Sequence, residues 1–347
     1  MGHERVRSVR LPGGRQLVVT PVFDTYWRFA TQRQEIFMRR VLGEPEPWTQ
    51  DPILLRHRFT NAYRASDRVS QYLIGNVLYA GSQSAKEVFF RCLLFKIFNR
   101  IDTWEYLASK IGPPRSSEFS LKRYSRVLDS RMAEGHSIYS AAYIMPSPPF
   151  GEVRKHANHL ALLESMLSQG MHEKIVAAKS LVDAFNILLS CPSFGNFLAF
   201  QFTIDLNYSS ILNFQESEHV VAGPGARDGI RKCFLDTGGL SESELIRAMA
   251  DIAPREFERL DLTFRDLWGR PLQPIDCQNL FCEVDKYARI AHPDIPGRTG
   301  RTRIKQRFAP LKAALPQWYP PKWKLTPGVR ISRAKKVTTQ GVLDFAP

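Results

Sequence analysis

The stretch that most constrains the fold runs from Ile187 to Tyr208, where an apolar segment is interrupted once, by Cys191-Pro-Ser-Phe-Gly195, and then resumes. Apolar residues recur at helical spacing on both sides, and the Pro and Gly of the interruption favour a tight turn. The pattern therefore predicts two helices joined by a short hairpin. The first backbone N–H groups of the second helix have no partner inside that helix, so they can bind a phosphate without a cationic side chain.

The hairpin signature of many DNA-binding proteins has the order apolar-x-Gly-apolar-Gly-x-x-x-Ala. Residues 191–199 fit this order except that Ser193 stands at the first glycine. Residues 222–226 supply both glycines, but Gly229 then stands where the alanine belongs. Short motifs recur by chance, and an ordinary helix connection or a surface turn would have the same sequence. The residues expected to contact the DNA backbone here are Ser193, Gly195, Asn196, Gly223, Gly225 and Arg227.

Positive charge is concentrated near the C-terminus. The formal net charge is +14, and residues 295–343 hold twelve Lys or Arg and no Asp or Glu. Such an excess favours a polyanionic partner. Trp318, Tyr319 and Trp323 are interleaved with it and could stack on bases or pack back on the protein body, while a solvated basic tail would look the same. Further backbone contacts are expected from Lys286, Arg289, Arg303, Lys305 and Arg307.

Two polar rows interrupt the apolar pattern. In residues 59–74 the polar side chains fall three and four apart, which predicts one helical face able to grip phosphates or read a base edge. A similar row lies in residues 275–289. A solvent-exposed helix face with salt bridges would have the same sequence pattern in both segments. The residues expected to line a base pocket are Asn61, Arg64, Asp67, Arg68, Gln71, Asp276, Gln278, Asn279 and Glu283.

The remaining chain predicts one helix after another and no ladder of strands. Asp24 is a candidate cap for the first long helix, residues 138–145 could be helix or strand, and residues 16–20 form a short strand. Further helices are expected at residues 87–107 (a pair), 120–134, 155–171, 241–253 and 275–289.

Several classes of protein are excluded by what the sequence lacks. It contains no Walker loop, no GxGxxG, no GxSxG and no apolar run of about eighteen residues, so no cofactor and no membrane span are expected. Five scattered cysteines read as buried thiols in a reducing compartment, and neither they nor His156, His159 and His172 have the spacing of a metal site. No apolar signal segment follows Met1, which suggests a cytoplasmic protein.

Several blocks resemble a known family. They are residues 47–49, 58–74, 94–99, 205–209, 222–226 and 276–283. Together they resemble the alpha-glutamyl/putrescinyl thymine pyrophosphorylases, which share a helical domain with phage 5-hydroxymethyluracil DNA kinases. The resemblance covers roughly residues 23–308. It implies an all-α fold similar to helix-hairpin-helix DNA glycosylases. We predict an N-terminal arm at 1–22, a helical catalytic domain at 23–308 and a basic, aromatic-containing C-terminal tail at 309–347.

The resemblance also implies double-stranded DNA carrying a modified pyrimidine as the substrate. No obligate protein partner is expected. One reaction is that of a DNA glycosylase, in which a bulky phage-type base is everted and its N-glycosidic bond is cleaved. The alternative is displacement of pyrophosphate from a modified thymine by an amine. A third hypothesis is that the protein is a non-catalytic DNA-binding module. We favour the glycosylase, because a chain without the kinase's P-loop suits defence against modified phage DNA.

The candidates for the catalytic carboxylate are Asp205, Glu216 and Glu218. In hairpin glycosylases the acid stands well beyond the second hairpin glycine, which points to Glu216, whereas Asp205 lies closer to Gly195. The choice between them stays open at this stage. No lysine stands at the hairpin position that bifunctional lyases use, so a monofunctional enzyme is expected.

Overall fold

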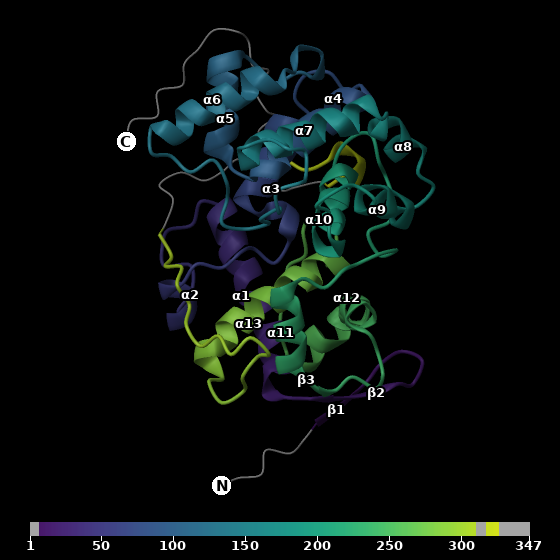
Figure 1. Ribbon diagram of the computed structural model, residues 1–347. Helices are drawn as coiled ribbons and strands as arrows, with labels where there is room; N and C mark the ends of the chain where they lie inside the picture. Colours follow the sequence, from purple (N-terminus) through teal and green to yellow (C-terminus); the bar gives the residue numbers. More distant parts are fainter. Residues whose placement is uncertain (1–6, 310–316, 326–347) are drawn as a thin grey trace.

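The computed structural model describes residues 7–309 and 317–325, and this part of the chain is mostly helical with one small antiparallel sheet (Figure 1). The strands are β1 Arg7–Arg10, β2 Gln16–Val19 and β3 Phe234–Asp236. The first helices are α1 Pro21–Val41, α2 Pro52–Arg56, the 3₁₀ turn η1 Arg64–Ser66, α3 Arg68–Tyr72, the π-helical η2 Leu73–Leu78, α4 Ala85–Phe98, α5 Ile101–Ile111, η3 Ser116–Glu118 and α6 Leu121–Ala133. They are followed by α7 Lys155–Ser168, α8 Met171–Ala177, α9 Leu181–Leu189, α10 Asn196–Asn207, α11 Pro224–Cys233, α12 Glu242–Arg259, α13 Pro274–Ala291 and the 3₁₀ turn η4 Pro321–Trp323.

The helices form two groups. In Figure 1, α4 to α9 lie in the upper half of the molecule, α11 to α13 lie with the strands in the lower half, and α10 lies between the two groups. The predicted hairpin is present as α9, a short turn and α10, with Gly195 as the residue that precedes α10. The expected helices at 87–107, 120–134, 155–171 and 275–289 are confirmed, apart from small differences at their ends. The helix expected at 241–253 is also present, but α12 continues through Pro254 to Arg259.

Strands β1, β2 and β3 form a sheet that the sequence did not reveal. β1 pairs with β2, and β2 pairs with β3, all antiparallel. The short strand predicted at 16–20 is confirmed as β2, but the expectation that no ladder forms is wrong. The reason is length, because β1 has four residues and β3 has three, too few to show an alternation of apolar and polar side chains.

Helix α1 begins earlier than the sequence suggested. Thr20, not Asp24, is the capping residue, and its hydroxyl accepts a hydrogen bond from Val22 N at 3.1 Å. Asp24 lies in the first turn and pairs with Arg7 and Arg259. Pro21 at the first helical position explains the earlier start, because its missing N–H needs no partner there.

Helices α11 and α13 cross at very short distance because α11 presents glycine. A side chain at Gly229 would place its Cβ closer than 3.0 Å to the carbonyl oxygen of Phe281, and one at Gly225 would approach the sulfur of Cys282 equally closely. Gly223, which precedes α11, lies against the ring of Phe197. The glycines of this turn therefore have a packing role.

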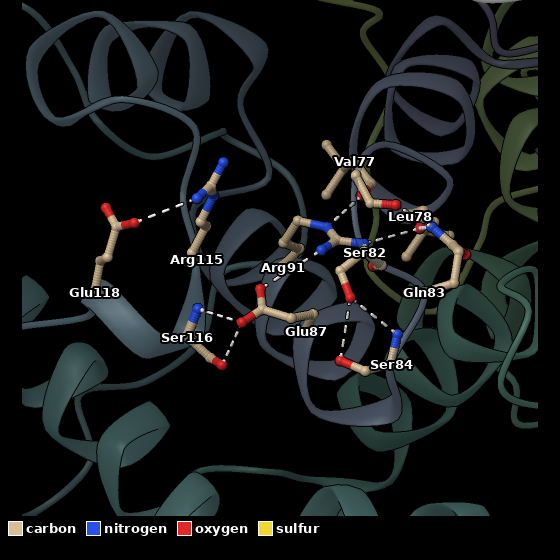
Figure 2. Close-up of polar contacts among 11 residues, drawn as sticks. Val77, Leu78, Ser82, Gln83, Ser84, Glu87, Arg91, Arg115, Ser116 and Glu118 are labelled. Atoms are coloured by element: carbon tan, nitrogen blue, oxygen red, sulfur yellow. Dashed lines mark hydrogen bonds and ion pairs between the residues drawn. The ribbon is translucent and has the colours of Figure 1, made fainter. Parts of the chain in front are cut away.

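Helix α4 is anchored through a buried arginine (Figure 2). Arg91 donates hydrogen bonds to the carbonyl oxygens of Val77, Leu78 and Ser82, where η2 ends and leaves carbonyl groups without helical partners. Glu87, one turn earlier on α4, pairs with Arg91 and accepts hydrogen bonds from the backbone N–H and hydroxyl of Ser116. These contacts fix the position of α4, which carries a lysine of the site described below.

Two local predictions are wrong. Residues 61–71 do not form one helix, because an irregular stretch, η1 and α3 follow one another there. Arg64 is consequently buried while Arg68 is exposed, so the residues of the row do not share a face. Residues 138–145 are neither helix nor strand.

The cysteines are free, four of them are buried, and Cys282 is partly exposed. Burial raises the pKa of each of them. The expectation of buried thiols is confirmed for Cys92, Cys191, Cys233 and Cys277. Within the described ranges no group of His, Cys, Asp and Glu is arranged to hold a metal ion. None of the helices there is long and apolar enough to cross a membrane.

Candidate active site

The centre of the candidate site is a buried carboxylate between two buried cations. Asp205, on α10, is 1% exposed. Arg64 grips both of its oxygens, with Nη1 at 2.8 Å from Oδ1 and Nη2 at 3.1 Å from Oδ2. The Nζ atom of Lys96, on α4, lies 3.0 Å from Oδ2. The cluster therefore joins η1, α4 and α10 through charge-assisted hydrogen bonds.

The charges of this cluster shift one another. Burial raises the pKa of Asp205, but Arg64 and Lys96 outweigh burial and bring the pKa below its ordinary value. Burial lowers the pKa of Lys96, and attraction to Asp205 offsets only part of this effect. Asp205 is thus an ionised carboxylate and a weak base. When Lys96 is protonated, the cluster carries two positive charges and one negative charge.

A chain of hydrogen bonds extends the cluster to α13. Arg64 Nε donates to Gln201 Oε1 at 3.0 Å, and Gln201 Nε2 donates to Gln278 Oε1 at 3.2 Å. The backbone N–H of Arg64 donates to Asp276 Oδ1 at 2.8 Å, while Asp276 Oδ2 accepts from the backbone of Gln273 at the start of α13. Burial, with the nearby charge of Glu216, raises the pKa of Asp276 to about 7.

The structure thus brings together Arg64, Asp205, Asp276 and Gln278 from the sequence-based candidates. Lys96 and Gln201 were missed. Lys96 lies in the apolar run Leu94-Phe-Lys-Ile-Phe98, and a single lysine amid residues that must be buried was the signal that could have found it. Gln201 precedes Asp205 by one helical turn, so it shares the same face of α10.

An aromatic pair lies next to the cluster. The rings of Tyr143 and Phe197 are stacked, with centroids 5.9 Å apart and 14° between their planes. Lys96 Nζ lies 4.5 Å from the centroid of the Tyr143 ring. Both aromatic residues are partly exposed, whereas Lys96 is buried. The pair therefore lies between the charged cluster and the protein surface.

Other base-pocket candidates hold a loop against α13. Asp67 accepts a hydrogen bond from the backbone of Asn61 at 2.8 Å, and burial raises its pKa to about 7. Asn279 donates to Thr60 Oγ1, and Glu283 accepts from the backbone N–H of Thr60 at 2.9 Å. These side chains stabilise the residues just before η1, which carries Arg64. Their direct contact with a base stays a prediction.

The other two candidate acids have different partners. Glu216 is buried and forms an ion pair with Arg270 at 2.6 Å, and its Oε2 has no hydrogen-bond partner in the described structure. Glu218 is exposed and accepts a hydrogen bond from the backbone of Leu181 at the start of α9. In the described residues Asp205 forms ion pairs with two cations, Glu216 forms one with Arg270, and Lys322 acts on Glu216 only through its nearby charge.

A basic groove of about 700 Å³ lies where α13 meets the chain that follows it. Its charged lining is positive throughout: Lys286, Arg289, Arg301, Arg303 and Lys305. Four of these residues were predicted to contact the DNA backbone. Arg307, also predicted to do so, is not part of the lining, and its backbone forms an isolated β-bridge with His57. Ala141, two residues before Tyr143, also borders the groove.

The first predicted backbone-binding turn is open. Gly195 and Asn196 are exposed, and a Cβ at Gly195 would meet no atom within 4 Å. Ser193 has a left-handed φ of 65°, a conformation that glycine adopts more readily than other residues. Arg227 pairs with Glu242 on the surface. Contact of these residues with DNA stays a prediction.

Residues 317–325 pack on the protein body. Tyr319 is buried and its hydroxyl is 2.7 Å from Ser66 Oγ, while Trp323 lies under the guanidinium of Arg270. Lys322 donates to the backbone carbonyls of Asn207, Ser209 and Leu212 at the end of α10. Gln71 accepts from the backbone of Trp318. The packing alternative is thus confirmed for these aromatic residues, and the basic residues at 312 and 330–336 lie outside the described residues.

Residues 20–297 match the family profile described as the helical domain of 5-hmdU DNA kinase. The chain belongs to this family. The 5-hmdU DNA kinase of Bacillus phage SP10 is 24% identical over 289 residues, which are 77% of this chain and 45% of the phage protein, so the chain spans about half the length of that relative. No solved structure matches. The expected kinship with the kinase helical domain is confirmed, and assignment to the pyrophosphorylases stays a prediction.

Proposed function

We propose that the chain binds double-stranded DNA carrying a thymine modified at its 5-methyl position, everts that base and catalyses substitution at the 5-methylene carbon. The observation that carries this proposal is the Arg64–Asp205–Lys96 cluster, which lies inside the segment shared with the kinase helical domain. The phage relative is named for a kinase acting on 5-hmdU, a thymine with a hydroxyl on that carbon. The basic groove supplies a site for the DNA backbone.

In the proposed reaction an amine attacks the methylene carbon of a base that already carries a pyrophosphate ester. The carbon–nitrogen bond forms, the carbon–oxygen bond breaks, and pyrophosphate leaves with the electron pair. The proton of the amine passes to water. Arg64 and Lys96 would stabilise the negative charge that develops on the leaving group, while Asp205 would hold both cations in place. A kinase-type reaction must supply the phosphorylated base.

The charge of the cluster is the reason for preferring substitution to cleavage of the N-glycosidic bond. Cleavage develops positive charge on the sugar, which two cations beside one carboxylate would oppose, whereas a departing pyrophosphate is stabilised by them. The sequence alone favoured the glycosylase, and we now place it second. What supports it is the α9–α10 hairpin followed by a buried carboxylate, the arrangement on which the glycosylase-like fold was expected.

The test is incubation of the purified chain with duplexes containing thymine, 5-hydroxymethyluracil or its pyrophosphorylated form, with and without putrescine, followed by nucleoside mass spectrometry. Substitution predicts a putrescine adduct formed only from the pyrophosphorylated base. A released base with an abasic site would establish the glycosylase instead. Unchanged DNA that is nevertheless bound would leave only a binding module.

Variants localise the chemistry. Lys96→Met should abolish adduct formation, because it removes a cation that stabilises the leaving group. Lys86→Met is the matched control, since Lys86 is an exposed lysine on the same helix, α4. Circular dichroism of both variants separates loss of catalysis from loss of folding. Full turnover by a folded Lys96→Met variant would contradict the proposed role of the cluster.

A further inference from the structure

The charged cluster is closed to an everted base in this structure, and the side chain of Tyr143 lies on its surface side. Arg64, Lys96 and Asp205 are all buried, so an everted base cannot reach them unless something moves. Tyr143 is the partly exposed side chain that contacts Lys96 from the surface side. Its ring is planar, is similar in size to a pyrimidine, and is stacked on the aromatic face of Phe197. These are the contacts that a nucleobase makes when it enters a protein pocket.

We infer that the ring of Tyr143 occupies, in the DNA-free protein, the position that the everted pyrimidine takes when DNA binds. The inference rests on the proposed function and assigns the base-binding position within that site. Phe197 is then the stacking platform, and the base replaces the ring of Tyr143 beside Lys96.

The backbone that carries Tyr143 is suited to withdrawal. It belongs to an irregular connection between α6 and α7, and Tyr143 itself has a left-handed φ of 57°, which is uncommon for an aromatic residue. Its neighbour Ile144 is 63% exposed. No hydrogen bond of the Tyr143 hydroxyl is found in the described structure, and the ring is held by stacking on Phe197, by the contact with Lys96 and by packing at the edge of the core.

Phe197, the proposed stacking platform, is held more tightly by its surroundings than the ring of Tyr143. Phe197 lies in the first turn of α10, and Gly223 packs against its ring so closely that a Cβ there would lie 2.5 Å from Phe197 Cε2. The connection that carries Tyr143 also reaches the basic groove, through Ala141. Phosphate binding in the groove and exchange of Tyr143 for the base therefore involve the same segment of chain.

The experiment compares Tyr143→Ala, Tyr143→Phe and Phe197→Ala in the full chain, using a duplex with one 5-hydroxymethyluracil and a matched thymine duplex. Affinity is measured by fluorescence anisotropy. Removing a ring that competes with the base should tighten binding of the modified duplex, by about tenfold if the ring is withdrawn in a tenth of the molecules. Tyr143→Phe should bind like the parent, because it keeps the ring. Phe197→Ala should bind more weakly.

Hydrogen exchange adds a direct view of the loop. Adding the modified duplex should increase amide exchange in residues 139–150 if Tyr143 leaves its position. A weaker affinity in Tyr143→Ala together with slower exchange would mean that the base stacks on Tyr143, and this result would overturn the inference. Unchanged affinity and exchange would overturn it as well.

The outcomes separate the inference from the proposed function. If the parent chain binds and converts modified DNA but the Tyr143 variants behave in the wrong direction, the inference alone fails. If the parent chain neither prefers nor converts a modified duplex, the proposed function fails, and the assignment of a base position fails with it.

Discussion

The turns that precede α10 and α11 have similar sequences and different physical roles. Gly195 is exposed, and a side chain there would meet empty space. Gly223 and Gly225 have no such freedom, because Phe197 and Cys282 fill the space that side chains would need. A glycine-rich turn offers its backbone to a phosphate only when no neighbouring element fills that space. The first turn meets this condition, and the second is used to bring helices together.

The contrast extends to what each turn leads into. The α10 side leads to buried charge, at Asp205 and its two cations, while the α11 side leads to close apolar contact with α13. The first is an expensive arrangement to fold, since buried ions lose their hydration. The second gains stability from packing. The stability of variants on each side tests whether the two sides differ in this way.

The largest effect is expected at the buried charge. Asp205→Asn leaves Arg64 and Lys96 buried without their counter-ion, and we expect a loss of about 3–5 kcal/mol in the free energy of unfolding. Denaturant titration measures it. The control is Asp102→Asn, whose exposed pair with Arg100 should cost at most about 1 kcal/mol. Equal losses in the two variants would show that the cluster is not the charged core described above.

The next effect is expected on the α11 side. Gly229→Ala forces a Cβ against the backbone carbonyl of Phe281, which cannot rotate away, so a loss of about 3 kcal/mol is expected. Gly195→Ala is the matched control from the other turn and should change stability by less than about 1 kcal/mol. Thermal unfolding of the pair measures the contrast directly. Similar melting temperatures would remove the distinction between the two turns.

A smaller loss is expected where a side chain, not the backbone, is in the way. Gly225→Ala places a methyl group against the sulfur of Cys282, and about 2 kcal/mol should be lost. Without that sulfur the methyl group has room, so Gly225→Ala should cost less stability in a Cys282→Ala background than in the parent chain. Strict additivity in this double-mutant cycle would mean that the two residues do not touch.

The last effect is a change of stability with pH, not a loss at one fixed pH. The folded pKa of Asp276 is about 7, raised by burial and then by Glu216, against about 3.9 in an unfolded chain. Between these values the folded state binds more protons, so this group lowers stability as pH rises from about 4 to about 7. Asp276→Asn should reduce the dependence there, measured as the denaturation midpoint against pH, and the part that remains is expected from Asp67, whose pKa burial also raises to about 7. Asp205, whose pKa is lowered, acts in the opposite direction and at lower pH.

Sequence reasoning found the elements but not the pairings of the site. Apolar periodicity gave the α9–α10 hairpin, and polar residues in unexpected places singled out Arg64, Asp276 and Gln278. It failed at residues 61–71, because evenly spaced polar side chains suggested a helix where the chain is irregular and each side chain has a different tertiary partner. It also passed over Lys96, because the apolar run around it indicated core.

The sequence by itself determined the helical character, the positions of most helices, the positive charge and the kinship with the kinase helical domain, because each depends on short-range patterns or on composition. Only the tertiary structure decided that Asp205 meets Arg64 and Lys96, that Tyr143 lies on Phe197, and that one glycine turn is open and the other filled. Those facts depend on which distant segments touch. Burial and the interaction energies between such segments set them, and no local pattern of residues contains that information.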